Sequence, residues 1–182
     1  MTSIADWILL THCTVPTGEV SLIAAHDAAE PEGQSPVRLP RFRELTPEQA
    51  TTILARHNMG RIAYAFHDRV GIEPIHYVYD KGFLYGRTSH GSKLTALKHQ
   101  PRVAFEVDEV EGLFDWRSVE VTGTFYQAAE DGSGPERAAW RHAIELLSKL
   151  VPGTMSESDP VAFRTVVFRI HVDEITGREA IS

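Results

Sequence analysis

The chain has 182 residues, of which 42% are hydrophobic, and a formal net charge of −7 at pH 7. This length and apolar content fit one globular domain and exclude a wholly disordered chain. The acidic surplus argues against a nucleic-acid partner, because phosphate backbones are matched by basic surfaces. The single cysteine, Cys13, excludes an intrachain disulfide framework and a cysteine-built zinc site, and we expect a cytoplasmic protein.

The first forty residues differ in composition from the rest of the chain. The apolar run at residues 7–10 is far too short to span a bilayer and follows an acidic residue, so we expect neither a signal peptide nor a membrane partner. Residues 26–40 are rich in Ala, Glu, Pro, Gly and Ser, which is typical of a solvated linker. We therefore expect an N-terminal extension with flexible parts over residues 1–40 and the main domain over residues 41–182.

The main domain has the pattern of a mainly β protein. Thr46 and Gln49 have the spacing of a capping box and predict a helix that begins near Pro47. Further helices are predicted near residues 90–99 and 135–150. Strands are predicted over residues 61–66, 71–80, 83–88, 102–110, 118–128 and 163–175, with the last ended by Thr176 and Gly177. Short turns between the first three strands favour antiparallel hairpins, and the whole pattern predicts a small Greek-key-like barrel with a few peripheral helices.

The loop after the third strand collects groups that suit an anion. Ser89 is placed to cap the next helix, Gly91 leaves room for a ligand, and Ser92 and Lys93 offer a hydroxyl and a cation. Arg87, at the end of the preceding strand, is expected to reach the same phosphate. Free N–H groups and the positive end of the helix dipole favour a bound anion there. An ordinary capped surface helix is the alternative.

Two further segments carry candidate binding residues. Pro74 and Ile75 lie on the second strand, followed by His76 and Tyr77, and period-two alternation puts Tyr77 and His76 on opposite faces. Imidazole titrates near neutral pH, which makes His76 a weak catalytic candidate, although ordinary aromatic core packing explains the strand equally well. The histidines lack metal-binding spacing, so we expect no metal site.

The start of the fifth strand pairs an aromatic ring with a guanidinium. Trp116 and Arg117, followed by Ser118, form a combination enriched at interfaces, and a Trp that closes the end of the barrel is the alternative. No nucleotide-binding glycine motif, Walker loop or nucleophile elbow occurs.

Taken in order, these segments resemble the FMN-binding split-barrel family typified by pyridoxamine 5'-phosphate oxidase, closest to its nitroimidazole-resistance branch. The resemblance covers roughly residues 41–178 and rests on the segments at residues 60–63, 74–80, 84–85, 89–94, 100–108 and 116–119, with Gly123.

The resemblance implies a homodimer that binds FMN in clefts between its subunits. It places Arg87, Ser89, Ser92 and Lys93 at the FMN phosphate, with Thr88 between the two ends of the cofactor. It also implies that residues 74–77 line the isoalloxazine and that residues 116–118 come from the partner subunit. The implied activity is hydride transfer between the flavin and a small molecule, with NADPH or NADH as electron donor.

Two departures from the family pattern narrow the function. Nitroimidazole-resistance relatives often carry a His where this chain has Arg87, and the Arg-rich substrate-phosphate pattern of the true oxidase is absent. Neither nitroreduction nor vitamin B6 oxidation therefore carries over directly. A flavin-binding or sensing module without turnover, and a split barrel that binds haem or a deazaflavin, remain alternative interpretations.

Overall fold

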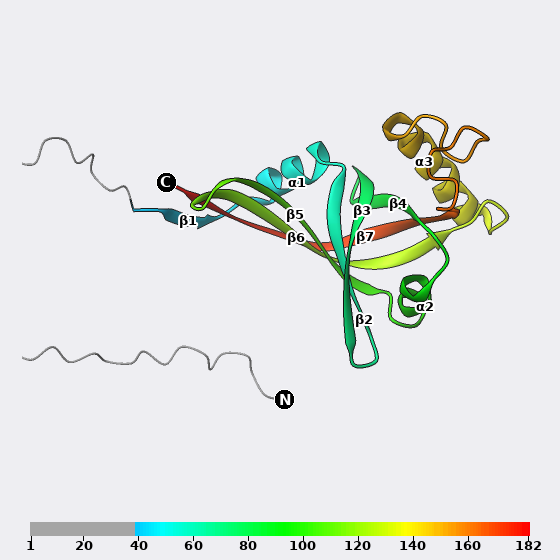
Figure 1. Ribbon diagram of the computed structural model, residues 1–182, viewed down its shortest axis with the longest axis horizontal. Helices are drawn as coiled ribbons and strands as arrows, with labels where there is room; N and C mark the ends of the chain where they lie inside the picture. The colour runs from blue at the N-terminus through cyan, green and yellow to red at the C-terminus, as the bar shows by residue number, and fades with distance from the viewer. Residues whose placement is uncertain (1–38) are drawn as a thin grey trace, which may run out of the picture. The chain divides into compact units, whose positions relative to one another are not determined.

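The computed structural model describes residues 39–182, so the N-terminal extension expected over residues 1–40 falls almost entirely outside the described residues. Within the described part, seven strands and three helices follow one another along the chain (Figure 1). In chain order they are β1 (Arg41–Glu44), α1 (Pro47–Arg56), β2 (Met59–Phe66), β3 (Arg69–Asp80), β4 (Phe83–Thr88), α2 (Ser92–His99), β5 (Arg102–Gly112), β6 (Asp115–Ala128), α3 (Gly134–Leu150) and β7 (Val166–Ile181).

The sheet closes on itself through β7. Its strand order is β1-β7-β4-β3-β2-β5-β6, every pairing is antiparallel, and β7 pairs with β6 as well as with β1 and β4. Strands β2 to β7 thus form a closed ring, and β1 extends it along β7. Closure removes most of the open sheet edge that other chains could pair with. The predicted antiparallel barrel is confirmed, and the short β1 is an element that the sequence pattern did not reveal.

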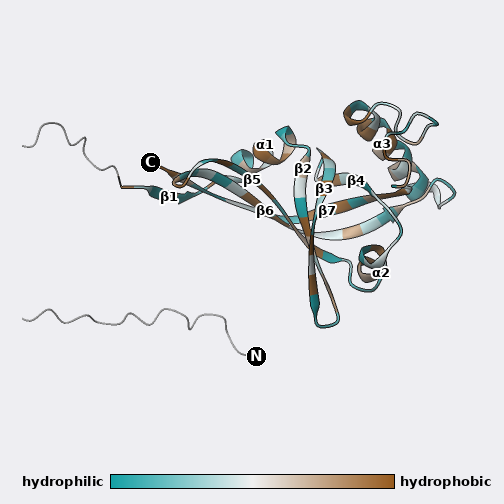
Figure 2. Ribbon diagram, in the orientation of Figure 1, coloured by the Kyte–Doolittle hydropathy of each residue, from teal (hydrophilic) through white to brown (hydrophobic). Residues whose placement is uncertain are grey.

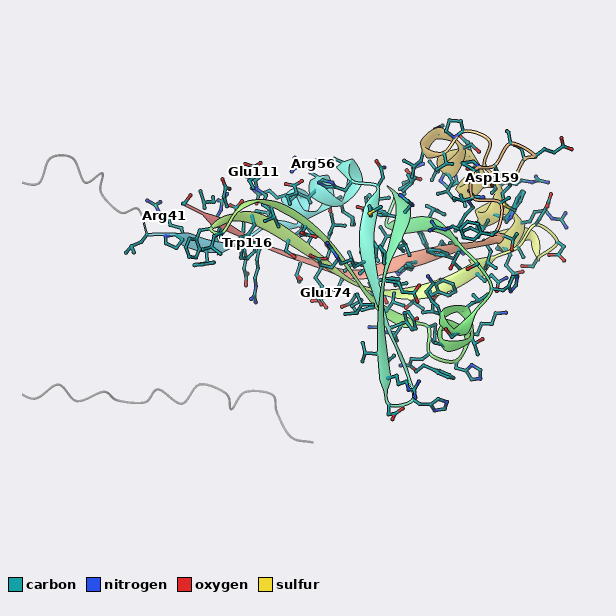
Figure 3. The ribbon with its side chains drawn as sticks, in the orientation of Figure 1. Arg41, Arg56, Glu111, Trp116, Asp159 and Glu174 are labelled. Carbon is teal, nitrogen blue, oxygen red and sulfur yellow. The ribbon has the colours of Figure 1, made fainter. Side chains whose placement is uncertain are left out.

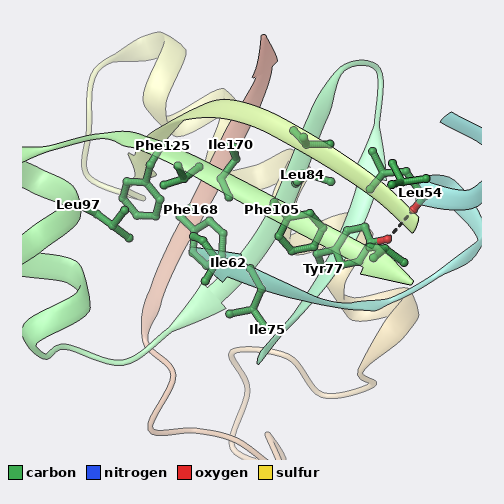
Figure 4. Packing of buried hydrophobic residues seen from close by; sticks show 14 of the residues in the cluster. Leu54, Ile62, Ile75, Tyr77, Leu84, Leu97, Phe105, Phe125, Phe168 and Ile170 are labelled. Atoms are coloured by element: carbon green, nitrogen blue, oxygen red, sulfur yellow. Dashed lines mark hydrogen bonds between the residues drawn. The ribbon is translucent and has the colours of Figure 1, made fainter. Parts of the chain in front are cut away.

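The barrel interior holds the main hydrophobic core. Tyr77 and Phe105 are fully buried in it and meet edge to face, with ring centroids 4.9 Å apart. Leu54 of α1 and Leu97 of α2 lie at opposite ends of the row of core side chains in Figure 4. The Tyr77 hydroxyl also donates a 2.7 Å hydrogen bond to the carbonyl oxygen of Leu54. This bond satisfies the one polar atom that Tyr77 brings into the core and fixes α1 against β3.

The helices begin where the sequence places their caps. Thr46 and Gln49 form the predicted capping box of α1, with Thr46 N donating to Gln49 Oε1 at 2.9 Å. Helix α3 has a second capping box from Ser133 and Glu136 and packs Ala139, Ala143 and Leu147 on the outer face of β4 and β7. None of the helices in residues 39–182 has the length and apolar character that a membrane span requires.

The last strand is longer than predicted. Thr176 and Gly177 do not end it, because β7 continues to Ile181. Gly177 is needed there for close approach and not for a turn: a Cβ atom on it would lie 2.8 Å from the Leu45 side chain, and its carbonyl accepts a 2.8 Å hydrogen bond from Leu45 N. The glycine thus lets the segment before α1 cross closely over β7.

The hairpin of β2 and β3 projects away from the rest of the barrel in Figure 1. It turns at His67 and Asp68, and Phe66 pairs with Arg69 across the turn. Val70 and Ile72 lie on its outer face with 74% and 66% of their surfaces exposed. The hydrophobic colouring of parts of this hairpin is visible in Figure 2. Val70 and Ile72, two positions apart on the same face, form an exposed apolar strip.

Candidate functional site

The candidate site lies in the loop that connects β4 to α2. Thr88 is buried at the end of β4, whereas Ser89, Gly91 and Ser92 are exposed. The prediction that Ser89 caps the helix is wrong: α2 begins at Ser92, Gly91 is its N-cap, and no side chain caps it. The chain stays non-helical for two residues longer than predicted, which carries Ser89 past the capping position. The first turn of α2 therefore keeps free N–H groups that can donate hydrogen bonds to a bound anion.

Lys93 lies in this first turn and is held by a carboxylate from β3. Its Nζ donates to Glu73 Oε2 at 2.7 Å, and the Tyr64 hydroxyl donates to Glu73 Oε1 at 2.6 Å. Only 14% of the Lys93 side chain is exposed, against 41% for Glu73. An added Cβ on the neighbouring Gly91 would meet nothing within 4 Å. A shielded cation thus stands beside open space at the start of a helix.

The hydrogen bonds around Glu73 shift the pKa values of both Glu73 and Tyr64. Burial acts to raise the pKa of Glu73, but hydrogen bonds from Lys93 and Tyr64 outweigh burial and leave that pKa below its ordinary value of 4.5. Burial and the bond to Glu73 raise the pKa of Tyr64 to about 12. At neutral pH the cluster therefore contains a carboxylate and a neutral phenol beside the lysine.

Arg87 does not point to the same place as Lys93. It forms a two-pronged ion pair with Asp159, in the segment after α3, and Nη2 lies 3.1 Å from Oδ1 in one of the two contacts. The Arg87 and Asp159 side chains are 5% and 1% exposed. The Arg87 guanidinium holds the pKa of Asp159 well below its ordinary value, and the backbone N–H groups of Met155 and Val161 act in the same direction. The two cations expected to share one phosphate therefore have separate partners.

The four candidate residues of β3 divide between two faces. Ile75 and Tyr77 are buried in the barrel core, so their side chains point away from the outer face of β3. Pro74 and His76 are exposed on the other face. His76 Nδ1 lies 3.4 Å from Arg164 Nη1, in the segment before β7. The alternation predicted for Tyr77 and His76 is confirmed.

The segment from Trp116 to Ser118 lies at the far end of the sheet from α2, as Figures 1 and 3 show together. Arg117 Nε donates to the buried Glu179 Oε2 at 3.0 Å. Ser118 Oγ donates to Glu106 Oε1 at 3.2 Å. The Trp116 ring packs against Phe42, with centroids 6.3 Å apart. Within one chain, these residues and the loop before α2 do not meet.

The structure thus brings together Ser92 and Lys93, with Ser89 in the preceding loop, but leaves the other candidates in separate places. Sequence reasoning missed Glu73 and Tyr64, which anchor Lys93. A signal for them was available, because a two-residue turn at His67 and Asp68 fixes the register that pairs Glu73 with Ile62 and brings it near Tyr64. No comparable signal pointed to Asp159, which is separated from Arg87 by 72 positions.

Comparison with known proteins finds one matching family model and a relative that covers most of this chain. The model of the family described as pyridoxamine 5'-phosphate oxidase matches residues 46–179. An uncharacterized protein of Rhizobium meliloti is 29% identical over 146 residues, which cover 76% of this chain and 95% of that protein.

Solved structures show the same fold. A FAD-binding protein from Mesorhizobium loti is 29% identical, with a TM-score of 0.62 over 79% of this chain and 99% of that one. The FAD-binding protein of Mycobacterium smegmatis shares the fold at 22% identity, with a TM-score of 0.54 over 76% of this chain and 98% of that one. The expected split-barrel fold is confirmed by these structures.

Proposed function

Since this chain belongs to the pyridoxamine 5'-phosphate oxidase family, we propose that it binds FMN and transfers hydride between the flavin and a small molecule. The observation that carries the proposal is the position of Lys93, a shielded cation in the first turn of an uncapped helix, beside a glycine that faces open space. The Mesorhizobium loti relative, named as FAD-binding, supports a flavin in this fold.

The phosphate end of the proposed site is formed by the loop before α2. Free N–H groups of the first turn, the exposed hydroxyls of Ser89 and Ser92, and the ammonium of Lys93 are all suited to a phosphate. When the phosphate binds, the Lys93 ammonium would donate hydrogen bonds both to Glu73 and to the phosphate. One lysine together with the free N–H groups of this turn can hold a single phosphate, which favours FMN over a dinucleotide with its pyrophosphate. Arg87 receives no phosphate contact in this proposal, because Asp159 already occupies its guanidinium.

The ring end of the proposed site lies on the outer face of β3. Pro74 has no N–H to donate and His76 offers the one titratable side chain among residues 74–77 on that face. The isoalloxazine, which supplies the redox chemistry when it is bound, would lie against β3 beside Pro74 and His76. The protein's own contribution is to position the reactants and exclude water.

The proposed site is completed by a second copy of the chain. The exposed apolar strip of Val70 and Ile72 on the projecting hairpin is a surface that a homodimer would cover. Because Trp116, Arg117 and Ser118 lie far from α2 in one chain, the proposal assigns them to the cleft of the partner subunit's flavin. NADPH or NADH is the proposed electron donor.

Identification of the cofactor that copurifies with the protein tests this proposal. The full chain, produced with ample riboflavin, is expected to be yellow and to release FMN on denaturation, as read by chromatography against FMN and FAD standards. Released FAD, a deazaflavin or a haem spectrum would each contradict the FMN assignment. Anaerobic mixing with NADPH or NADH then tests turnover: bleaching of the flavin absorbance is expected, and a flavin that stays oxidised with both donors would indicate a binding or sensing module.

A further inference from the structure

A cavity of about 180 Å³ lies between the outer face of β3 and β4 and the segment that joins α3 to β7. Its walls are mainly apolar, and the apolar side chains that form them are Leu147, Leu150, Val151, Pro160 and Val161. For scale, an engineered apolar cavity of about 150 Å³ in another protein binds benzene. The cavity is therefore large enough for one six-membered ring with a small substituent.

The outer wall of this cavity is held in place without any ligand. Asp159 accepts hydrogen bonds from Met155 N at 2.7 Å and from Val161 N at 3.0 Å, and it also forms the buried ion pair with Arg87. Through these contacts, the middle of the irregular segment between α3 and β7 is fixed to β4. Figure 3 shows Asp159 near α3. A preformed wall lowers the ordering cost of binding, because little chain entropy is lost when the ligand enters.

Among the described residues, one cation at this cavity has no acidic partner. Arg164 follows a tight turn closed by the 2.9 Å bond from Arg164 N to Val161 O, and its guanidinium lies 3.4 Å from His76 Nδ1. Within residues 39–182, no carboxylate oxygen comes within 4.0 Å of Arg164. The charge of Arg87, in contrast, is balanced by Asp159. The lining thus carries one unbalanced positive charge, beside an imidazole that can add a hydrogen bond.

The geometry points to a binding site for a small hydrophobic monocarboxylate, a single ring or a group of that size with one acid function. The carboxylate would bond to the fork of Arg164 with His76 beside it, and the ring would fill the space against Leu147 and Val161. A monoanion matches one guanidinium, whereas a phosphate dianion would enter an apolar space with half of its charge unbalanced. The site uses none of the groups around Lys93, but it shares His76 with the ring end of the proposed flavin site.

Benzoate is the probe, and binding to the full-length protein is followed by calorimetry and by amide shifts in NMR spectra. We expect saturable binding in the millimolar range, with shifts in residues 147–164. Benzamide has the same shape without the charge, and we expect it to bind at least about tenfold more weakly, because a charge-assisted bond is lost. Equal binding of benzamide, or no saturable binding of benzoate, would overturn the inference.

Variants locate the site. Arg164→Met should weaken benzoate binding by about tenfold or more, and Arg164→Lys by less, because it keeps the charge and loses the fork. The control Arg141→Met removes an exposed positive charge from α3 and should leave binding within about twofold. Val161→Phe should block the cavity while keeping Arg164, and Leu150→Phe serves the same purpose if the first variant does not fold. Equal effects of the Arg164→Met and Arg141→Met variants would overturn the assignment.

The measurements are repeated with the protein stripped of cofactor and with excess FMN. Unchanged benzoate affinity is expected in the stripped protein. With excess FMN we expect at most about a threefold loss, because the flavin ring would share His76 but not Arg164, Leu147 or Val161. Displacement of benzoate by FMN would show that the cavity belongs to a flavin site and would overturn the inference of a separate one.

Discussion

Lys93 and Glu73 form an ion pair across the junction of α2 and β3, with Nζ 2.7 Å from Oε2. The cation that suits a phosphate is therefore already held in place by a carboxylate, in a position where 14% of its side chain is exposed. Such a pair can both orient the lysine and compete with an incoming anion. If competition dominates, replacing Glu73 should strengthen anion binding; if orientation dominates, replacing Glu73 should weaken it. Replacing Lys93 should weaken anion binding in either case.

Removal of the cation should weaken flavin binding. We expect Lys93→Ala to raise the Kd for FMN about 10- to 100-fold, because a partly shielded charge-assisted hydrogen bond contributes about 1.5–3 kcal/mol. Fluorescence titration of the stripped protein with FMN measures this. Lys98→Ala is the matched control, because Lys98 is exposed in the last turn of the same helix and should leave the Kd unchanged. Equal Kd values for wild type and Lys93→Ala would rule out the phosphate assignment.

Removal of the competing carboxylate should have the opposite effect. Glu73→Gln keeps an acceptor for Lys93 and Tyr64 but loses the negative charge beside the proposed phosphate. We expect FMN to bind about three- to tenfold more tightly, since two like charges about 4 Å apart repel by about 1 kcal/mol when water screens them, and 41% of the Glu73 side chain is exposed. Glu111→Gln, an exposed change on β5, controls for the change in net charge. Weaker binding in Glu73→Gln would mean that the carboxylate chiefly orients the lysine.

The exposed strip on the projecting hairpin should be an interface. Ile72→Glu places a charge in the proposed apolar contact, and we expect the dimer to dissociate and the FMN affinity to fall with it. Size-exclusion chromatography with light scattering gives the mass in solution. The control is Ala138→Glu, which adds the same charge at an exposed position of α3. A wild-type protein that is monomeric at micromolar concentration would contradict the assignment.

Glu109 should make the stability of the fold depend on acid pH. Hydrogen bonds from Arg56 and His57 outweigh burial and lower the pKa of Glu109 from 4.5 to about 2. A carboxyl group with a lowered pKa in the folded state contributes its full stabilisation at pH values above its pKa in the unfolded state. That contribution is lost as the pH falls toward the pKa in the folded state. The difference in Tm between wild type and Glu109→Gln should therefore be constant above about pH 5 and shrink between pH 4.5 and about 2. A difference that persists unchanged at the acid end would contradict this.

The buried pair of Arg87 and Asp159 should stabilise the segment after α3. We expect Asp159→Asn to lower the Tm, because it leaves the Arg87 charge buried without a counter-charge. Arg87→Met combined with Asp159→Leu should recover part of the loss, since no buried charge then remains. Arg102→Met breaks an exposed pair with Asp173 and should change the Tm little. Similar losses in Asp159→Asn and Arg102→Met would show that burial of the first pair has no consequence.

The fold was predictable from the sequence because its signals are local. The capping box of Thr46 and Gln49 and the alternation of buried residues along β6 and β7 depend on neighbours only a few positions apart. The extent of β7 was not predictable in this way. Gly177 has the appearance of a turn residue in the sequence, and only the crossing of Leu45 over it shows its role in close approach.

The candidate site was predictable only where its residues are neighbours in the sequence. The grouping of Ser92 with Lys93 at a helix start follows from adjacency. The partner of Arg87 could not be inferred, because Asp159 lies in an irregular segment with no periodicity to fix its position. Ser89 was misplaced as a cap because helix boundaries depend on where the first turn closes, and Gly91 delays that point.

The closure of the barrel by β7 has a consequence for the newly made chain. Strands β4 and β6 both pair with β7, so during synthesis the preceding strands have two bare edges until the last of the seven emerges. Pairings between segments so distant in the sequence form slowly, and open edges invite contact between chains. Expression at low temperature, or with a chaperone that shields strand edges, should therefore raise the soluble yield.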